Sequence, residues 1–482
     1  MIFNSYLFIF LFIPVSFITY HVGNRIKPVI GKLILILASI IFYTHGRTET
    51  LKYLGISILI NYLFALFIHC KQIKNRFLIS IPIIINIGSL MYFKYTDFVI
   101  ENINSIFSSD HALKNLILPL GISFYTFQQI AYVVSISDGS LNNIRLIDYL
   151  TYILYFPKLI MGPLADPVDF INSLNDEKRL KFNIDNFACG IKLFSFGLLK
   201  KVLIADTFAK AVSWTYTNLE TATAVDCLLL MLFYTFEIYF DFSGYSDMAT
   251  GVSMIYNLEL PINFDSPYKA LSIRDFWKRW HVSLTKFLTK YIFIPLGGSR
   301  KGSARTYFNI LIVFLISGIW HGANWTFILW GILHGILNCF DRAVEKVAEK
   351  ILKPIRWLLT FISVNMLWLL FSSESVFQWT DILKKAFGLQ KISVSDGLIN
   401  VFRLPEDQFI FDLLHLNYPA SHIHGFNLIL FTVMAAIICF FPQNNYRAKD
   451  KFGPVSLVLA AFAFIWGALC LGTESEFLYF GF

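Results

Sequence analysis

The sequence predicts an all-α polytopic integral membrane protein with about a dozen hydrophobic segments, some of them re-entrant or interfacial. Hydrophobic residues make up 56% of the 482 residues and aromatic residues 17%, while only 15% are charged, against about 25% in an ordinary soluble domain. A water-soluble globule cannot hide that much apolar surface, whereas lipid solvates an apolar exterior. This composition excludes a soluble enzyme, a disordered chain and a nucleic-acid-binding domain.

The apolar segments are long enough to cross a bilayer, since a spanning helix needs about 20 mostly apolar residues and about 17 can suffice. They are 4–20, 30–46, 51–69, 77–95, 116–136, 149–165, 187–204, 225–243, 306–321, 325–340, 355–371, 425–442 and 455–472. No internal repeat or low-complexity linker divides them, so residues 1–482 are expected to form one integral membrane domain. The first segment lacks a preceding basic residue and a cleavage site, so it is expected to remain as a helix.

The charges of the loops predict the orientation of the chain in the cytoplasmic (inner) membrane. Residues 21–32 and 70–76 each carry three basic residues and no acidic one, and residues 272–305 have a net charge of +7. Residues 373–424, the longest non-apolar stretch, have a net charge of −2. Because Lys and Arg concentrate in cytoplasmic loops, the basic loops are expected inside, and 373–424 is expected to form a long extracytoplasmic loop.

The apolar segments in the middle of the chain do not fit a strict alternation of cytoplasmic and extracytoplasmic loops. If 116–136, 149–165, 187–204 and 225–243 all crossed the membrane, the +7 loop would lie outside. One of the first three must therefore be re-entrant or interfacial. Pro119 and Gly121 make 116–136 the predicted candidate, because non-helical backbone at membrane depth is tolerated where protein covers it.

Acidic residues lie within or directly after the segment 225–243. Glu237 and Asp241 are four positions apart on one helix face, and Asp247 follows. Ionisable groups at membrane depth are rare and often functional. Pairing with Lys or Arg inside the helix bundle is the alternative, and the sequence leaves both open.

Residues 272–290 alternate apolar and basic positions at helical spacing. This pattern predicts one amphipathic helix at the cytoplasmic interface, with Ser272 and Asp275 forming a capping box at its start. His281 lies within it. The favoured interpretation on composition alone is an aromatic ring at headgroup level that performs no chemistry.

A second histidine, His321, ends the apolar segment 306–321 between Gly318 and Gly322. An imidazole can take and return a proton near neutral pH, as general acid–base catalysis requires. The predicted topology places His281 near the inner face and His321 toward the outer end of the next helix, so two histidines would bracket a path through the membrane. A structural interhelical hydrogen bond is the alternative for His321, and equally for His334.

Six ordered motifs are recognisable within a core of residues 225–342. They are Tyr239 to Ala249, Leu260 to Phe264, Phe276 to His281, Ile294 to Gly298, Gly318 to Gly322 and Trp330 to Gly335. Together they resemble the membrane-bound O-acyltransferase family, in particular its bacterial branch of alginate O-acetylation and teichoic-acid D-alanyl transfer proteins. Weaker similarity extends to 118–128, 197–206 and the tail 477–480.

The resemblance implies a mechanism. A transmembrane tunnel is expected, with an acyl donor, acetyl-CoA, entering from the cytoplasm and no metal or bound cofactor. His321 is expected to be the catalytic residue and His281 a second catalytic-site residue. Substrate contacts are expected from Trp320, Asn324, Arg279, Trp280, Asp241 and Ser243.

The function expected is O-acetylation of an exported polysaccharide, such as alginate, a cellulose-like exopolysaccharide or peptidoglycan. The acetyl group would pass to an extracytoplasmic acetyltransferase partner or to the polysaccharide itself. D-alanyl transfer to teichoic acid is the alternative activity. Two non-enzyme alternatives are a proton-coupled transporter, which favours repeat symmetry that this sequence lacks, and a scaffold for another acyltransferase.

Overall fold

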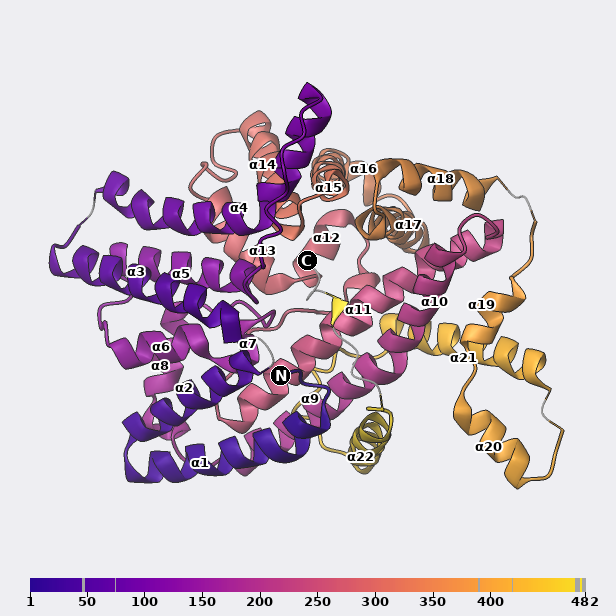
Figure 1. Ribbon diagram of the computed structural model, residues 1–482, viewed down its shortest axis with the longest axis horizontal. Helices are drawn as coiled ribbons and strands as arrows, with labels where there is room; N and C mark the ends of the chain where they lie inside the picture. Colours follow the sequence, from indigo (N-terminus) through magenta and orange to yellow (C-terminus); the bar gives the residue numbers. More distant parts are fainter. Residues whose placement is uncertain (46–47, 74, 389–390, 418, 473–476, 479–482) are drawn as a thin grey trace.

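The computed structural model describes residues 1–482 apart from 46–47, 74, 389–390, 418, 473–476 and 479–482. Throughout this described part the chain forms helices and loops, without a β-strand (Figure 1). The predicted all-α fold class is therefore confirmed. Two positions of the tail motif 477–480 fall outside the described residues.

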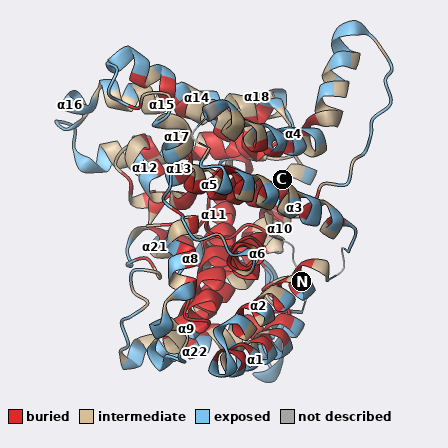
Figure 2. Cartoon of the chain, turned by 90° about the vertical axis from the view of Figure 1, so that its left-hand side faces the viewer, coloured by how far each residue is buried: buried red, intermediate tan, exposed pale blue. Residues whose placement is uncertain are grey.

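Two long antiparallel helical rods form the centre of the molecule (Figures 1 and 2). The first rod runs through α9 (Ile184–Leu199), the π-helical η4 (Lys200–Ala205) and α10 (Asp206–Thr217). The second is α11 (Ala224–Ile255), in which every residue from 233 to 255 is buried. Because α11 is enclosed by protein on all sides, it can carry charged and polar groups that lipid would not accept.

Two glycine pairs let these rods approach closely. A Cβ atom on Gly197 would lie 2.7 Å from the carbonyl oxygen of Gly244, and one on Gly190 would lie 2.5 Å from that of Gly251. Small residues at such crossings allow backbone-to-backbone contact, which drives helix association in membranes. The glycines therefore fix how α9 lies on α11.

The remaining helices surround this centre. The N-terminal group lies on the left in Figure 1 and consists of η1 (Phe8–Phe12), α1 (Ile13–Ile26), α2 (Pro28–Thr44), η2 (Thr48–Thr50), α3 (Leu51–Cys70), α4 (Arg76–Phe107) and α5 (Ile122–Ser137). The C-terminal group consists of α14 (Ser303–His321), α15 (Trp325–Ala343), α16 (Glu345–Ala348), α17 (Lys353–Ser372), α18 (Val376–Phe387), α19 (Asp396–Val401), α20 (Pro405–Leu413), α21 (Ala420–Phe440) and α22 (Pro454–Leu469).

Several of these helices are suited to lipid. Six helices in the described residues are long and apolar enough to cross a membrane, namely Phe8–Ile26, Thr48–Cys70, Phe77–Phe107, Ser303–His321, Lys353–Ser372 and Ala420–Phe440. α2 and α22 are shorter apolar helices. Large apolar side chains point outward along them, as in α22, where Val455 and Leu469 are 73% and 76% exposed. Such an exterior is stable only against lipid.

The structure shows that one of the middle segments folds back. Residues 149–165 do not form one long helix, because they split into α6 (Leu146–Leu154), α7 (Phe156–Leu159) and a turn before α8 (Pro167–Asn175). The segment 116–136 is helical only from Ile122 onward, in α5. Lys32 donates hydrogen bonds to Asp148 (2.6 Å) and Asn175 (2.7 Å), which flank 149–165. The chain therefore enters and leaves on one side, and every residue of 149–165 except Leu150 is buried, as non-helical backbone at membrane depth requires.

The predicted interfacial helix over 272–290 is also wrong. The segment forms α12 (Ile273–Arg279), α13 (Val282–Leu288) and the π-helical η6 (Thr289–Phe293), with His281 at a left-handed φ of 43° between the first two. Trp277, Trp280 and His281 are buried. Burial of two indoles and an imidazole draws the segment into the bundle, and the turn at His281 permits it. The Ser272 N-cap is confirmed, since its Oγ accepts from the Asp275 amide at 3.2 Å.

The acids of α11 include two ion-paired groups. Lys201 contacts Asp241 at 2.8 Å, and Lys200 contacts Asp247 at 2.7 Å. For these two residues the alternative of structural pairing is the one observed. Both lysines lie in η4, so the ion pairs attach this π-helix to α11.

Candidate active site

His321 is the last residue of α14 and is positioned by a neighbouring helix. Lys94 of α4 donates hydrogen bonds to the carbonyl oxygens of Trp320 (2.8 Å) and His321 (2.7 Å), and the Tyr95 hydroxyl donates to that of Gly322 (3.0 Å). The last carbonyls of a helix lack partners within the helix, and a cation there also suits the helix dipole. Lys94 and Tyr95 therefore fix the backbone that carries His321.

Aromatic side chains enclose the His321 ring. Its centroid lies 4.8 Å from that of Trp320, 5.1 Å from Trp330 and 5.2 Å from Phe371. Gly318 contributes to this packing, because a Cβ there would lie 2.4 Å from the Phe327 carbonyl oxygen of α15. The expected close helix approach at Gly318 is thus present, and the apolar enclosure excludes bulk water from the imidazole.

One ring nitrogen of His281 has a hydrogen-bond partner, and the other has none among the described residues. Its Nδ1 lies 3.1 Å from Oδ1 of Asn263, an oxygen that also accepts from the Ser283 hydroxyl at 2.8 Å. The amide orientation is supported by the bond from Asn263 Nδ2 to Ser246 Oγ. Because Oδ1 accepts, Nδ1 carries the proton, and the lone pair lies on Nε2. That atom is buried and has no hydrogen-bond partner among the described residues.

The structure brings the two histidines into one cluster, which corrects the expectation that they bracket the membrane. Trp320 lies between them, with its ring centroid 6.2 Å from His281 and 4.8 Å from His321. His334 borders the same cluster, since its ring lies 4.8 Å from Trp330. It also accepts a hydrogen bond on Nδ1 from Trp277 Nε1 at 3.3 Å, so the alternative of an interhelical hydrogen bond holds for His334.

The other predicted site residues fall into several environments. Trp320 belongs to the histidine cluster, whereas Trp280 packs in the core 4.7 Å from Trp368. Asn324 caps α15 by accepting from the Thr326 amide at 3.0 Å. It also donates to the Glu374 carbonyl oxygen at 2.9 Å, which joins the start of α15 to the end of α17.

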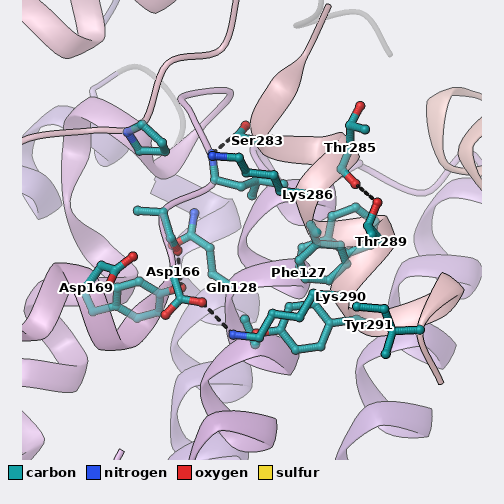
Figure 3. Close-up of a pocket in the computed structure, with 17 residues that line it drawn as sticks. Phe127, Gln128, Asp166, Asp169, Ser283, Thr285, Lys286, Thr289, Lys290 and Tyr291 are labelled. Atoms are coloured by element: carbon teal, nitrogen blue, oxygen red, sulfur yellow. Dashed lines mark hydrogen bonds and ion pairs between the residues drawn. The ribbon is translucent and has the colours of Figure 1, made fainter. Parts of the chain in front are cut away.

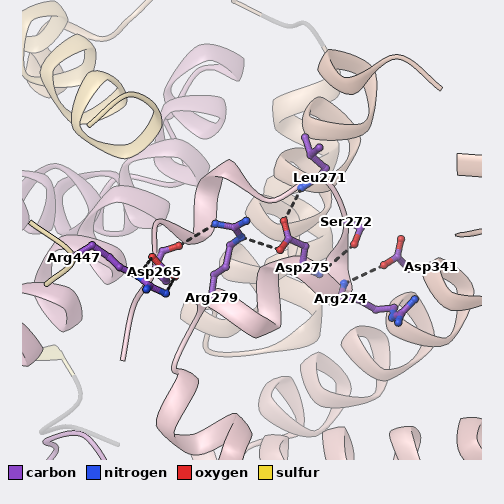
Figure 4. A network of polar contacts seen from close by, with 8 residues as sticks. All are labelled: Asp265, Leu271, Ser272, Arg274, Asp275, Arg279, Asp341 and Arg447. Carbon is purple, nitrogen blue, oxygen red and sulfur yellow. Dashed lines mark hydrogen bonds and ion pairs between the residues drawn. The ribbon is translucent and has the colours of Figure 1, made fainter. Parts of the chain in front are cut away.

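Arg279 lies in a half-exposed polar network rather than near the histidines (Figure 4). It donates to Asp275 at 2.8 Å and to the Asp265 carbonyl oxygen at 3.3 Å. Arg447 donates to the Asp265 carboxylate at 2.8 Å. This carboxylate raises the pKa of the Arg447 guanidinium above its ordinary value. In Figure 4 the network continues to the Arg274 amide, which donates to Asp341. The network therefore connects α12 with α15 and with the loop after α21.

Asp241 and Ser243 lie on α11, on either side of Phe242. Asp241 accepts from Lys201 and, at 3.1 Å, from the Leu478 amide of the C-terminal tail. The Ser243 hydroxyl is buried without a hydrogen-bond partner among the described residues. Phe242 itself contacts His281, with ring centroids 4.8 Å apart. α11 therefore reaches the cluster through Phe242.

A cavity of about 420 Å³ adjoins the cluster (Figure 3). Its polar lining includes Gln128, Asp166 and Lys290, and the last two form an ion pair at 2.7 Å. At its apolar side Phe127 stacks on Phe287 (4.3 Å) and on Trp320 (5.4 Å). These rings separate the cavity from the histidines.

Sequence reasoning missed several residues of this site. Asn263 belongs to the motif 260–264 but received no role, and Phe127 lies in the weakly similar stretch 118–128. Lys94 carried a usable signal, because a lysine inside the apolar segment 77–95 is a rare intramembrane charge. The sequence did not reveal its hydrogen-bond partners, which lie at the end of a helix more than two hundred residues later.

Known proteins resemble this chain along its whole length. A model of the MBOAT, membrane-bound O-acyltransferase family, matches residues 141–377. The chain is 36% identical to the peptidoglycan O-acetyltransferase of Helicobacter pylori, over 100% of this chain and 98% of that protein. It is 36% identical to a probable alginate O-acetylase, AlgI, of Pseudomonas aeruginosa, over 78% of this chain and 73% of that protein.

A more distant similarity reaches the teichoic acid D-alanyltransferase of Bacillus subtilis, at 29% identity over 52% of this chain and 64% of that protein. The O-acetyltransferases thus align over more of the chain than the D-alanyltransferase does. The family match includes α14 and α15 with His321, as well as the turn that carries His281. The chain belongs to the membrane-bound O-acyltransferase family.

Proposed function

We propose that this protein transfers acetyl groups from cytoplasmic acetyl-CoA, across the inner membrane, to the hydroxyl groups of an exported polysaccharide. The proposal is supported by relatives named for O-acetylation of peptidoglycan and alginate, one of which aligns with the whole chain. An extracytoplasmic acetyltransferase partner or the polysaccharide itself receives the group. Both fates use the same transmembrane transfer.

The donor is proposed to enter through the cavity at Gln128 and Lys290 (Figure 3). Lys286 and Lys290 of its lining belong to the +7 segment 272–305, which the positive-inside rule places in the cytoplasm. The stacked rings of Phe127 and Trp320 then lie between a bound donor and His321. Movement of these rings is required before the acyl group can reach the histidines.

His321 is proposed to remove the proton from the acceptor hydroxyl, or to carry the acyl group itself. His281, with its proton on Nδ1 and its lone pair on Nε2, is the second proton acceptor of the cluster. The remaining predicted substrate contacts at Trp320, Asn324 and Ser243 stay part of the proposal. The observation that carries it is the enclosed imidazole of His321, whose backbone Lys94 positions and which only the Trp320 ring separates from the imidazole of His281.

The test is a pair of substitutions at this residue. His321→Gln retains hydrogen bonding but cannot take a proton at working pH, so it should lower acetyl transfer about 10²–10⁴-fold, as His321→Ala should. Both proteins should accumulate in the membrane at the normal level. The measurement is the acetyl-ester content of the extracellular glycan together with membrane-protein abundance. Ester content near wild type in His321→Gln would show that His321 is structural.

D-alanyl transfer to teichoic acid is the second candidate, favoured by the similarity to the B. subtilis protein. Isotope labelling separates the two. Membranes that contain the protein are given either acetyl-labelled acetyl-CoA or labelled D-alanine with its activating enzymes, and the label on the exported polymer is measured. Transfer of alanine without acetate would replace the first proposal.

A further inference from the structure

A second cavity, of about 870 Å³, lies between η4, α10, α11, the segment 401–406 and the end of α22. Exposed side chains line its mouth, namely Lys210, Arg403 and Glu406. Arg403 and Glu406 belong to 373–424, whose net negative charge favours the extracytoplasmic side. This outer cavity is therefore distinct from the cavity at Gln128 and opens at the opposite end of the predicted topology.

Glu237 lies in the wall of the outer cavity. It is only 6% exposed, and its Oε2 has no hydrogen-bond partner among the described residues. Lys201, in the same wall, lies 2.8 Å from both Asp206 and Asp241. A buried carboxyl oxygen without a hydrogen-bond partner is costly, so a donor from outside the chain would stabilise it. The π-helical η4 beside it is a type of distortion frequent at functional sites.

A series of residue contacts connects the outer cavity to the histidine cluster. α10 lines the cavity with Trp214, and two residues later the Tyr216 hydroxyl lies 2.6 Å from the Ser372 hydroxyl of α17. The preceding residue of α17, Phe371, contacts the His321 ring at 5.2 Å. A molecule bound in the outer cavity would thus lie on the Phe371 side of His321, whereas the donor cavity lies on the Trp320 side.

We propose that the outer cavity binds the glycan acceptor, with Glu237 accepting a hydrogen bond from a sugar hydroxyl. The inference rests on the proposed function, because it gives the acceptor of that reaction a site. A carboxyl oxygen accepts hydrogen bonds whether or not the group is ionised, and a sugar presents many hydroxyl donors, so the two are complementary. The described residues contain no cluster of three or more His, Cys, Asp or Glu suited to a metal ion.

Cys470 allows binding to be measured without activity, because it lines the outer cavity and is partly exposed. The full-length protein carrying Cys70→Ser is placed in lipid nanodiscs and treated with a maleimide, with labelling at Cys470 followed by mass spectrometry. The probe is a tetrasaccharide of alternating N-acetylglucosamine and N-acetylmuramic acid. We expect the probe to slow labelling several-fold.

Glu237→Leu removes the accepting oxygen and should raise the probe concentration needed for half-protection about 2- to 10-fold, the value of one hydrogen bond. In transfer assays it should raise the acceptor KM by a similar factor and leave the KM for acetyl-CoA unchanged. Glu220→Leu is the matched control, because Glu220 is an exposed acid outside the cavity and should behave like the parent. Protein abundance and thermal unfolding are measured for all variants.

The outcomes separate this inference from the proposed function. Acetyl transfer without protection of Cys470, or with an unchanged acceptor KM in Glu237→Leu, would overturn the acceptor site and leave the function standing. Protection that depends on Glu237, in a protein that transfers no acetyl group, would support the site and overturn the function. Protection by glycine ethyl ester, a small cation, but not by the tetrasaccharide would show that Glu237 binds an ammonium group instead.

Discussion

Individual residues in this protein act across helix boundaries. Lys94 is the clearest example, because its side chain extends from the lipid-facing helix α4 and donates hydrogen bonds to the last carbonyl oxygens of α14. Asn263 acts in the same way on His281, since one amide oxygen fixes both the imidazole and the Ser283 hydroxyl. A residue outside its own helix therefore positions each histidine: Lys94 holds the backbone of His321, and Asn263 holds the imidazole of His281.

Replacing Lys94 should remove the hydrogen bonds that hold the backbone of His321 in place. Lys94→Met keeps most of the apolar stem but leaves two partly buried carbonyl oxygens without their donor, which costs about 1–3 kcal/mol. We expect a lower thermal-unfolding temperature in detergent and reduced acetyl transfer. Lys350→Met, at an exposed position of the loop after α16, is the matched control and should leave both unchanged. Equal stability of the two variants would contradict the assigned role of Lys94.

Replacing His281 tests whether it acts as more than a ring. His281→Phe preserves an aromatic group of similar size beside Phe242 and Trp320 but removes Nε2 and the bond to Asn263. Acetyl transfer should fall about 10²-fold or more at normal membrane abundance, because an acid–base group is lost. Full activity in this variant would show that His281 only fills space.

At the scale of elements, packing overrides the local hydrophobic pattern. The periodicity of 272–290 predicted one interfacial helix, yet the segment turns at His281 because Trp277 and Trp280 are more stable inside the aromatic core than at the interface. The segment 149–165 is apolar enough to span but folds back, since Lys32 holds both of its ends. In both cases a tertiary contact decides between conformations that the pattern permits equally.

The α9–α11 contact should be sensitive to a single methyl group. A Cβ on Gly251 would lie 2.5 Å from the Gly190 carbonyl oxygen and 2.7 Å from the Phe194 amide nitrogen. Gly251→Ala should therefore destabilise the protein by about 1–3 kcal/mol, seen as reduced membrane abundance and a lower unfolding temperature. Gly88→Ala is the control, because that helical position has open space and alanine is the better helix former. Equal behaviour of both variants would argue against close contact.

At the scale of the whole molecule, two cavities lie on different sides of one histidine cluster. The proposed donor cavity is lined by Phe127, which stacks on Trp320, and the outer cavity is linked to the cluster through Phe371. This arrangement suits group transfer between compartments. Membership of an acyltransferase family confirms the expected enzyme class over the transporter and scaffold alternatives.

The topology is testable with introduced cysteines in a Cys70→Ser, Cys339→Ser, Cys470→Ser background, whose three remaining cysteines are buried. A membrane-impermeant maleimide added to intact cells should label Glu406→Cys, and should label Lys301→Cys only after the membrane is opened. Asn142→Cys and Lys178→Cys, both exposed and on either side of the folded-back segment, should behave like Lys301→Cys. Labelling of only one of these two from outside would mean that 149–165 crosses the membrane.

The sequence alone determined the membrane class, the helical segments and the chemical motif at His321, because hydrophobic length and motif order are local properties of a chain. Only the tertiary structure decided which segment folds back, that Asp241 and Asp247 pair with lysines, and that His281 and His321 share one aromatic cluster. These features depend on contacts between residues that are distant in sequence. Burial of aromatic rings and pairing of intramembrane charges, whose partners a one-dimensional pattern does not specify, provide their physical cause.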